Sequence, residues 1–324
     1  MAQAIVFERT GGPDVLEQVE VAVGAPGPGE VLIRHEAVGL NFADTYFRTG
    51  YYPSTLPSGM GVEAAGVVLQ VGPGVTGFGA GDRVTYTGSP LGAYSTERVM
   101  PAGSLIHLPD DISAETAAAM TMRGLTTAYL LTRICPSLRP GDTVLLQAAA
   151  GGVGLIFTQW AKAMGIRTIG VVSTEAKAQI ARDHGCTETV LRDQDVVGRV
   201  RELTDGAGVP VAFDSVGQAT VPTSLDCLAR RGMLVAFGTA SGPIPPIDAF
   251  QLAAKGSLYF TRPALADYIA DPVERAELAG ELFGLVRSGD IDVRIGQRYA
   301  LGQAVDAHRK LESGETVGSS VFVC

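Results

Sequence analysis

Cysteine and long apolar stretches are both scarce in this sequence of 324 residues. The 4 cysteines lie far apart, at Cys135, Cys186, Cys227 and Cys324, and include no Cys-x-x-Cys pair. This spacing argues against a zinc cluster or a disulfide framework and favours a reducing, cytoplasmic setting. No apolar run approaches the roughly 20 residues that span a bilayer, and MAQAIVFERT at the start has no basic segment followed by an apolar core. We therefore expect neither a membrane span nor a secretory signal.

Positive charge is also in short supply. Lys and Arg total 25 against 34 Asp and Glu, which leaves a net charge of −9. An acidic balance weighs against a surface built for nucleic acid or for an anionic membrane. Apolar residues, by contrast, make up 46% of the chain. That share predicts a folded protein with a large core, and the length predicts two domains.

The first part of the chain differs from the rest in composition and in predicted secondary structure. Residues 1 to 125 are rich in Gly and Pro, with short β-type runs (AIVF, VLIRHEAV, GVVLQV, DRVTY) between turn segments such as 23–31 and 71–84. These features predict an irregular β-rich domain. After about Thr261 a helical stretch, PVERAELAGELFGLVRSG, and a final strand, SSVFVC, are expected to return to it. The predicted domains are 1–125 with 265–324, and 126–264.

From about Pro140 strands and helices alternate. The expected strands are apolar on both faces: 143–148, 168–172, 188–192, 211–216, 233–238 and 257–260. Amphipathic stretches such as LIFTQWAKAMG and QATVPTSLDCLARRG lie between most of them and are expected to be helical. This alternation predicts an α/β domain with a six-stranded, doubly wound parallel sheet of the Rossmann type, which binds dinucleotides.

The turn AAAGGVG at 148–154 follows the first of these strands and opens a helix. The spacing GxGxxG falls here on Ala149, Gly151 and Gly154, so the first glycine is replaced. Small residues at this place let the backbone approach a pyrophosphate, or they only let a helix pack closely on a strand. The strand–turn–helix context favours phosphate binding.

The end of the second strand distinguishes between nucleotides. A site for unphosphorylated ribose usually has Asp or Glu there, whereas this chain has Ser173, with Glu175 expected at the start of the next helix. Lys177 and Arg192 lie nearby in the predicted topology, and the chain has only four lysines. Two cations and a hydroxyl group suit a 2′-phosphate and predict NADPH; the alternative is that both are ordinary solvated charges.

Seven motifs along the whole chain point to a family. They are NFADTYFRTGYYP (41–53), GVEAAGVV (61–68), GDRV (81–84), GLTTAYLL (124–131), AAAGGVG (148–154), DSVG (214–217) and GSLYFTRP (256–263). In this order they resemble the zeta-crystallin-like NADPH:quinone oxidoreductases, a branch of the medium-chain dehydrogenase/reductase superfamily. The resemblance implies a GroES-like catalytic domain beside the dinucleotide-binding one, and AxxGxxG is the usual form of the turn in this branch.

The resemblance also implies site residues. Asn41, Asp44, Tyr46 and Tyr52 are expected to line a cleft for the nicotinamide and the acceptor, with Asp44 acting either there or only in fixing the loop. The residues expected to bind the cofactor are Asn41, Thr126, Ala150, Gly151, Gly152, Val153, Ser173, Lys177, Arg192, Ser215, Val216, Phe237, Gly238, Phe260 and Arg262. For Arg262 a structural ion pair is an equal alternative.

A metal is not expected. The zinc alcohol dehydrogenases of the superfamily have a Cys near the place of Asn41 and GHE where this chain has GVE. Val62 thus stands where a ligand histidine would be, and valine has no lone pair. The four histidines, His35, His107, His184 and His308, are dispersed and fit no ligand spacing.

The expected function is NADPH-dependent reduction of quinones by direct hydride transfer in a cleft between the domains, without metal. Reduction of an activated C=C bond in enones or enals is the enzymatic alternative, because the same hydride geometry serves it. The non-enzymatic alternatives are an NADPH sensor and an RNA-binding protein, and the acidic balance disfavours the second. The short apolar strand 256–260 is expected at a sheet edge, where it predicts a homodimer.

Overall fold

The computed structural model describes all 324 residues and divides them into two compact units. Unit 1 comprises Met1–Leu125, Pro272–Arg287 and Val293–Cys324, and unit 2 comprises Thr126–Asp271 and Ser288–Asp292. No helix combines the length and the apolarity needed to cross a membrane. Each unit has its own sheet and its own core.

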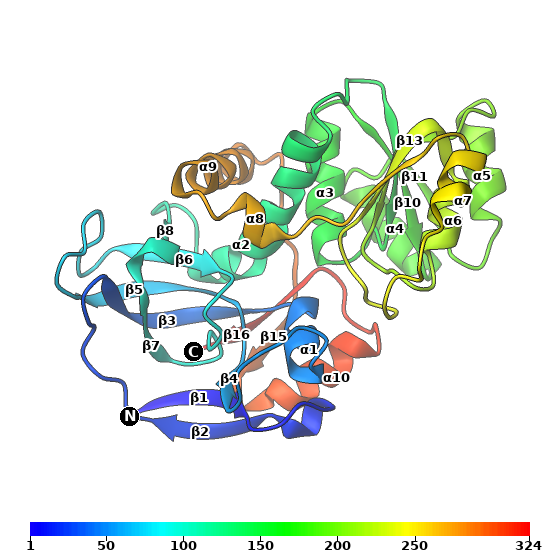
Figure 1. Ribbon diagram of the computed structural model, residues 1–324. Helices are drawn as coiled ribbons and strands as arrows, with labels where there is room; N and C mark the ends of the chain where they lie inside the picture. The colour runs from blue at the N-terminus through cyan, green and yellow to red at the C-terminus, as the bar shows by residue number, and fades with distance from the viewer. The chain divides into compact units, whose positions relative to one another are not determined.

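Unit 2 is built on a six-stranded parallel sheet with helices on both faces (Figure 1). The strand order is β11-β10-β9-β12-β13-β14, the doubly wound order, which confirms the predicted fold class. The strands are β9 (Thr143–Gln147), β10 (Arg167–Val172), β11 (Glu188–Leu191), β12 (Val209–Asp214), β13 (Leu228–Ala236) and β14 (Tyr259–Thr261). The side chains of the central strands β9, β10, β12 and β13 are mostly buried on both faces, as a sheet covered on both sides requires.

The helices of unit 2 follow the strands in turn. They are α3 (Gly152–Ala163), α4 (Glu175–Asp183), α5 (Val196–Leu203), α6 (Val221–Asp226), α7 (Ala249–Ala254) and α8 (Leu265–Tyr268). The helix expected over QATVPTSLDCLARRG is wrong in its second half, because α6 ends at Asp226 and β13 begins at Leu228. Leu228 is buried and pairs with Val209 of β12, so its apolar side chain belongs to the sheet.

Two short segments after β14 also belong to unit 2, whereas the sequence placed the return to the first domain at 265. Tyr268 of α8 stacks on Tyr129, with ring centroids 4.3 Å apart. Gln159 of α3 binds the backbone of Asp292 twice, with its Nε2 donating to the carbonyl at 3.1 Å and its Oε1 accepting the N–H at 2.8 Å. These contacts hold residues 265–271 and 288–292 to the dinucleotide-type sheet.

Unit 1 is β-rich. A seven-stranded sheet has the order β15-β16-β3-β5-β6-β8, with β7 also pairing with β3, and a smaller sheet has the order β2-β1-β4. The strands are β1 (Ala2–Phe7), β2 (Glu17–Val21), β3 (Glu30–Leu40), β4 (Ser58–Gly59), β5 (Glu63–Val71), β6 (Arg83–Thr87), β7 (Glu97–Pro101), β8 (Ile106–His107), β15 (Ile295–Ala300) and β16 (Ser319–Val323). The helices are α1 (Phe42–Thr49), α9 (Pro272–Ser288) and α10 (Ala304–Glu312), and α2 (Ala114–Tyr129) begins in this unit.

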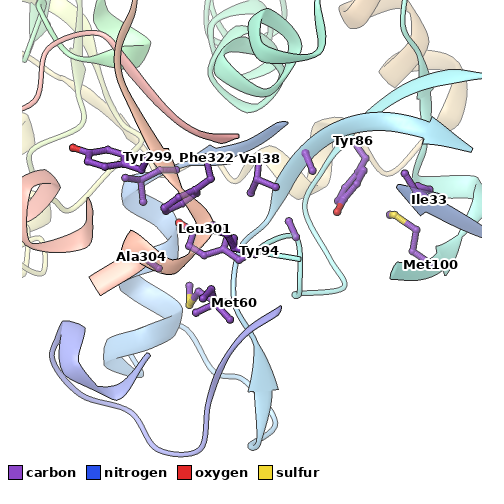
Figure 2. Packing of buried hydrophobic residues seen from close by; sticks show 14 of the residues in the cluster. Ile33, Val38, Met60, Tyr86, Tyr94, Met100, Tyr299, Leu301, Ala304 and Phe322 are labelled. Atoms are coloured by element: carbon purple, nitrogen blue, oxygen red, sulfur yellow. The ribbon is translucent and has the colours of Figure 1, made fainter. Parts of the chain in front are cut away.

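The core of unit 1 joins distant parts of the sequence. Phe322 of β16 packs on Tyr94, with ring centroids 4.7 Å apart, and Val38 of β3 and Leu301 lie beside them (Figure 2). Burying a large apolar side chain of this kind contributes about 1.5–3 kcal/mol. The return segment is therefore part of the same core as the first β-strands.

Candidate functional site

The turn after β9 presents backbone N–H groups at the start of α3. Ala148 adopts a left-handed conformation with φ of 56°, and Gly151 precedes the helix with φ −79° and ψ 175°. The first N–H groups of a helix have no carbonyl partner one turn earlier, so those of Gly152 and Val153 are available to an anion. Gly151, Gly152 and Val153 are partly exposed, and Ala150 is buried beneath them.

The same turn also packs closely. A Cβ on Gly154 would lie 2.6 Å from the carbonyl carbon of Ala149, and a Cβ on Gly170 of β10 would lie 2.6 Å from the Cβ of Ala149. Only glycine fits at either place. Phosphate binding and close helix packing are thus compatible roles for this turn, because α3 can pack on the sheet while its N-terminal N–H groups remain at the turn.

The ends of β10 and β11 bring Ser173, Lys177 and Arg192 to one place. The Arg192 N–H donates to the Val172 carbonyl at 2.8 Å, and Lys177 lies in the first turn of α4. Burial and, second, the charge of Arg192 lower the pKa of Lys177, so the two cations lie close enough to repel each other. Glu175 begins α4, as expected, and its carboxylate pairs with Arg182 at 2.7 Å. This corner of the sheet therefore favours an anion.

The loop after β12 is held by Asp214, which sequence reasoning missed. Its wholly buried carboxylate accepts the N–H of Val216 at 2.8 Å and the hydroxyl of Ser224 at 2.8 Å. These bonds fix Ser215 and Val216 at the carboxyl edge of the sheet, and the motif DSVG already contained the residue. A Cβ on Gly238 would collide with the carbonyl oxygen of Ser215 and lie 2.9 Å from its carbonyl carbon, so the loops after β12 and β13 touch.

Other residues predicted to bind the cofactor lie in varied surroundings. Phe237 is partly buried, Phe260 packs against the core of unit 2, and Thr126 is buried. Arg262 follows β14 and donates to the Pro263 carbonyl at 3.0 Å. Contact with a cofactor is still a prediction for all of them.

In unit 1, Asn41 and Asp44 form a reciprocal capping box at the start of α1. The Asn41 backbone N–H donates to Asp44 Oδ2 at 2.8 Å, and the Asn41 Nδ2 donates to Glu63 Oε2 at 2.7 Å. Glu63 Oε1 in turn accepts the Met122 N–H at 2.6 Å, and Arg123 Nη1 lies 3.5 Å from Oε2. Asn41, Asp44, Glu63 and Arg123 are all buried, so this is an internal polar cluster.

Tyr46 and Tyr52 belong to an aromatic group on α1 and the loop that follows it. Their ring centroids are 5.1 Å apart in an edge-to-face arrangement, and Tyr51 stacks on Tyr52 at 5.5 Å. The Tyr52 N–H donates to the Tyr46 carbonyl at 2.9 Å, which holds the loop against the helix. Tyr46 and Tyr52 are only partly buried.

A chain of hydrogen bonds leads to Asp44 from the other side. Arg48 Nη1 donates to His308 Nδ1 at 2.9 Å, because arginine can only donate. His308 Nε2 therefore carries the ring proton and donates to the Tyr94 hydroxyl at 3.2 Å, and Tyr94 donates to Asp44 Oδ2 at 2.8 Å. Burial and the charge of Arg48 lower the pKa of His308 to about 3, in agreement with a neutral ring.

The two carboxyl groups of this cluster hold protons more tightly than usual. Burial raises the pKa of Asp44 to about 7, and Asp44 Oδ1 has no hydrogen-bond partner. Burial also raises the pKa of Glu63 to about 7, against the charge of Arg123, which lowers it. Sequence reasoning predicted Asn41 and Asp44 but missed Glu63, Arg123 and Tyr94; the only sequence signal was Glu63 itself, beside Val62 in the GVE motif.

The donor atoms near Asn41 do not suit a zinc ion. Val62 is buried and offers no ligand atom, and the Asn41 amide is already bound to Glu63. The structure groups no three His, Cys, Asp or Glu side chains in a way that could hold a metal.

Both units are similar to domains of known proteins. The family model of the alcohol dehydrogenase GroES-like domain matches residues 27–110, and the model of zinc-binding dehydrogenases matches residues 152–264. A quinone oxidoreductase of Pseudomonas aeruginosa is 52% identical over 325 residues, which cover 100% of both chains. A 2-haloacrylate reductase of a Burkholderia species is 44% identical, over 100% of this chain and 99% of the relative. The crystal structure of an Escherichia coli quinone oxidoreductase complexed with NADPH has a TM-score of 0.97 at 46% identity, covering 99% of this chain and 100% of that one.

Proposed function

This chain belongs to the quinone oxidoreductase family of the medium-chain dehydrogenases/reductases, and we propose that it reduces quinones with NADPH, by direct hydride transfer and without a metal. One observation carries the metal-free part. At the place where zinc-dependent relatives hold their metal, this chain has Val62 and an Asn41 whose amide is engaged with Glu63. A quinone needs no Lewis acid, because hydride addition leaves a stabilised phenolate.

Cofactor binding is assigned to unit 2. The N–H groups at the start of α3 would hold the pyrophosphate, and Lys177, Arg192 and Ser173 would hold the 2′-phosphate. Asp214 keeps the loop at 215–217 in place for the cofactor through its bonds to Val216 and Ser224. When bound, NADPH supplies a hydride and is left as NADP⁺.

The acceptor is assigned to Asn41, Tyr46 and Tyr52 of unit 1. The quinone gains two electrons and one hydrogen nucleus, so negative charge develops on its oxygen. An amide N–H or a tyrosine hydroxyl stabilises that charge by donating a hydrogen bond. One proton from solvent then gives the hydroquinone. The protein mainly positions the acceptor, and no side chain is required as a general acid.

Reduction of an activated C=C bond is the second candidate. It is supported by the 44% identity to a 2-haloacrylate reductase, whose name indicates a substrate with such a bond. Hydride addition to such a bond leaves an enolate, whose carbon must be protonated before the product leaves. This reaction therefore depends on a proton donor more strongly than quinone reduction does.

A comparison of a quinone with an enone of similar size tests the function. We expect NADPH-dependent reduction of the quinone to be faster, to persist after prolonged chelation, and to fall only about ten-fold in Tyr46→Phe and Tyr52→Phe, since positioning groups contribute about 1.4 kcal/mol of barrier. The measurement is the initial rate of NADPH oxidation. A faster enone reaction that either Tyr→Phe substitution abolishes would establish the alternative, and NADPH binding without turnover of either acceptor would indicate a sensor.

We also propose a homodimer that pairs β14 of one copy with β14 of another. β14 is the edge strand of the six-stranded sheet, and Tyr259 on it is exposed. An unpaired apolar edge invites pairing with a symmetry mate. Light scattering at micromolar concentration should give twice the chain mass of 33.7 kDa, and Tyr259→Pro, which removes a backbone donor, should give monomers. A wild-type monomer would contradict the proposal.

A cytoplasmic location for the protein is still a prediction.

A further inference from the structure

Glu63 is a buried carboxylate with hydrogen bonds to both of its oxygens. It lies at the start of β5, wholly buried, with Oε1 on the Met122 N–H and Oε2 on the Asn41 amide. A Cβ on Gly39 of β3 would collide with Glu63 Oε2 and with the Ala118 carbonyl, so the neighbouring strand leaves room for this one group. Arg123 balances its charge from 3.5 Å and also donates to the Leu40 carbonyl. The start of α1, β3 and α2 thus all contact Glu63, which lies in unit 1 and outside the turn at 148–154.

The bond to Asn41 decides which end of the amide faces Glu63. An ionised carboxylate only accepts, so it selects the Nδ2 side of the amide. An amide nitrogen has two N–H groups, and Glu63 takes one of them. Asp44 holds the backbone of Asn41, because its carboxylate accepts the Asn41 N–H at 2.8 Å. A protonated Glu63 could donate instead, and it would then suit the carbonyl end of the amide equally well.

We propose that Glu63 is a positioning residue whose ionised carboxylate orients the Asn41 carboxamide, so that the second N–H of Asn41 points to the acceptor oxygen that becomes negative during hydride transfer. The inference rests on the function proposed above. A flipped amide would present its carbonyl oxygen to that developing charge, and the two would repel. Glu63 therefore acts on the transition state through Asn41 and has no contact of its own with the acceptor.

The groups that face Glu63 determine its titration. Arg123 on α2 favours the ionised carboxylate, whereas burial opposes it and the pKa is about 7. Asp44 on α1 is sensitive to the charge of Glu63, and so is Tyr86 on β6. Tyr94, on the loop before β7, is bonded to Asp44. Because the ionised form is the active one, kcat should fall as the pH drops through about 7.

The first test is the pH profile of kcat for quinone reduction in the wild type and in Glu63→Gln. We expect the substitution to lower kcat by about 10²-fold, the cost of losing one well-placed oxyanion donor, with little change in KM. We also expect it to abolish the fall toward acidic pH. Glu115→Gln is the matched control, because Glu115 lies on the surface in an ion pair with Arg298 and should keep the wild-type profile. A variant with wild-type kcat, or with the acidic fall intact, would overturn the inference.

The second test needs no turnover and no variant of Glu63. In the cofactor-free protein, the NMR signals of the Asn41 side-chain amide, identified by their loss in Asn41→Ser, should titrate near pH 7 in the wild type and also in Asp44→Asn, which removes the other carboxyl group bonded to Asn41. Asn41 amide signals that do not move across this pH range, or that stop moving in Asp44→Asn, would contradict the role of Glu63, even if Glu63→Gln failed to fold. A wild type that does not reduce quinones would count against the proposed function instead, and the titration in Asp44→Asn would still decide whether Glu63 orients Asn41.

Discussion

Replacing Lys177 with alanine should weaken the binding of NADPH by roughly 10- to 150-fold and leave the binding of NADH nearly unchanged. Lys177 and Arg192 meet at the ends of β10 and β11, and each charged contact to a 2′-phosphate contributes about 1.5–3 kcal/mol. Burial and, second, the charge of Arg192 lower the pKa of Lys177, so a phosphate placed there would relieve a repulsion present in the free protein. NADH lacks this phosphate, so its affinity should not depend on Lys177.

Lys162→Ala is the matched control. Lys162 is an exposed residue near the end of α3, far along the helix from the phosphate turn, and its replacement should affect neither cofactor. Quenching of protein fluorescence gives both dissociation constants without turnover. Equal losses for NADPH and NADH in Lys177→Ala would remove Lys177 from the 2′-phosphate site and leave the alternative of a solvated charge.

Arg48→Met is expected to lower the free energy of unfolding by about 3–5 kcal/mol, because it leaves three partners without their donor. Each loss costs about 1–3 kcal/mol, and the least for Glu312, whose carboxylate is partly exposed. The Arg48 side chain is 1% exposed and has three partners: the Gly11 carbonyl at 3.1 Å, His308 at 2.9 Å and Glu312 at 2.6 Å. Methionine fills much of the same volume but donates to none of them. His308 would also lose the bond that fixes its ring proton, and with it the direction of the bond to Tyr94.

Thermal unfolding of Arg48→Met measures this cost. The Tm should fall by roughly 6–20 °C, because 1 kcal/mol corresponds to about 2–4 °C in units of this size. Arg309→Met is the control, since Arg309 is 53% exposed and pairs with Asp14 and Asp306 on the surface. Surface pairs contribute about 0–1 kcal/mol. A similar Tm for the two variants would mean that the buried chain to Asp44 contributes no stability.

The doubly wound sheet was predictable because its strands are short and apolar on both faces, with helical patterns between them. The same reasoning failed over QATVPTSLDCLARRG, where Val221, Leu225 and Leu228 recur at helical spacing. Only the first two face the core from α6; Leu228 already pairs with β12. Periodicity cannot tell the end of a short helix from the buried start of the next strand.

The polar cluster was predictable only in its local part. Asn41 and Asp44 lie three residues apart and form a capping box, a pattern that sequence spacing reveals. Arg48 and His308 are 260 residues apart, and nothing in either segment indicates the other. Glu63 lies next to Val62 in the sequence, but its partners Asn41 and Met122 are 22 and 59 residues away, so spacing alone does not reveal its role.

The central position of β16 dictates an order of events during synthesis. β16 lies between β15 and β3, and Phe322 on it is wholly buried in a core that also contains Tyr94 and Val38 from the first part of the chain. All of unit 2 is translated before β15, α10 and β16 leave the ribosome. The dinucleotide-type sheet can therefore assemble first, while residues 37–40 of β3 still lack their partner strand. Chaperones that shield exposed strand edges would act on this protein at that stage, and on β3 in particular.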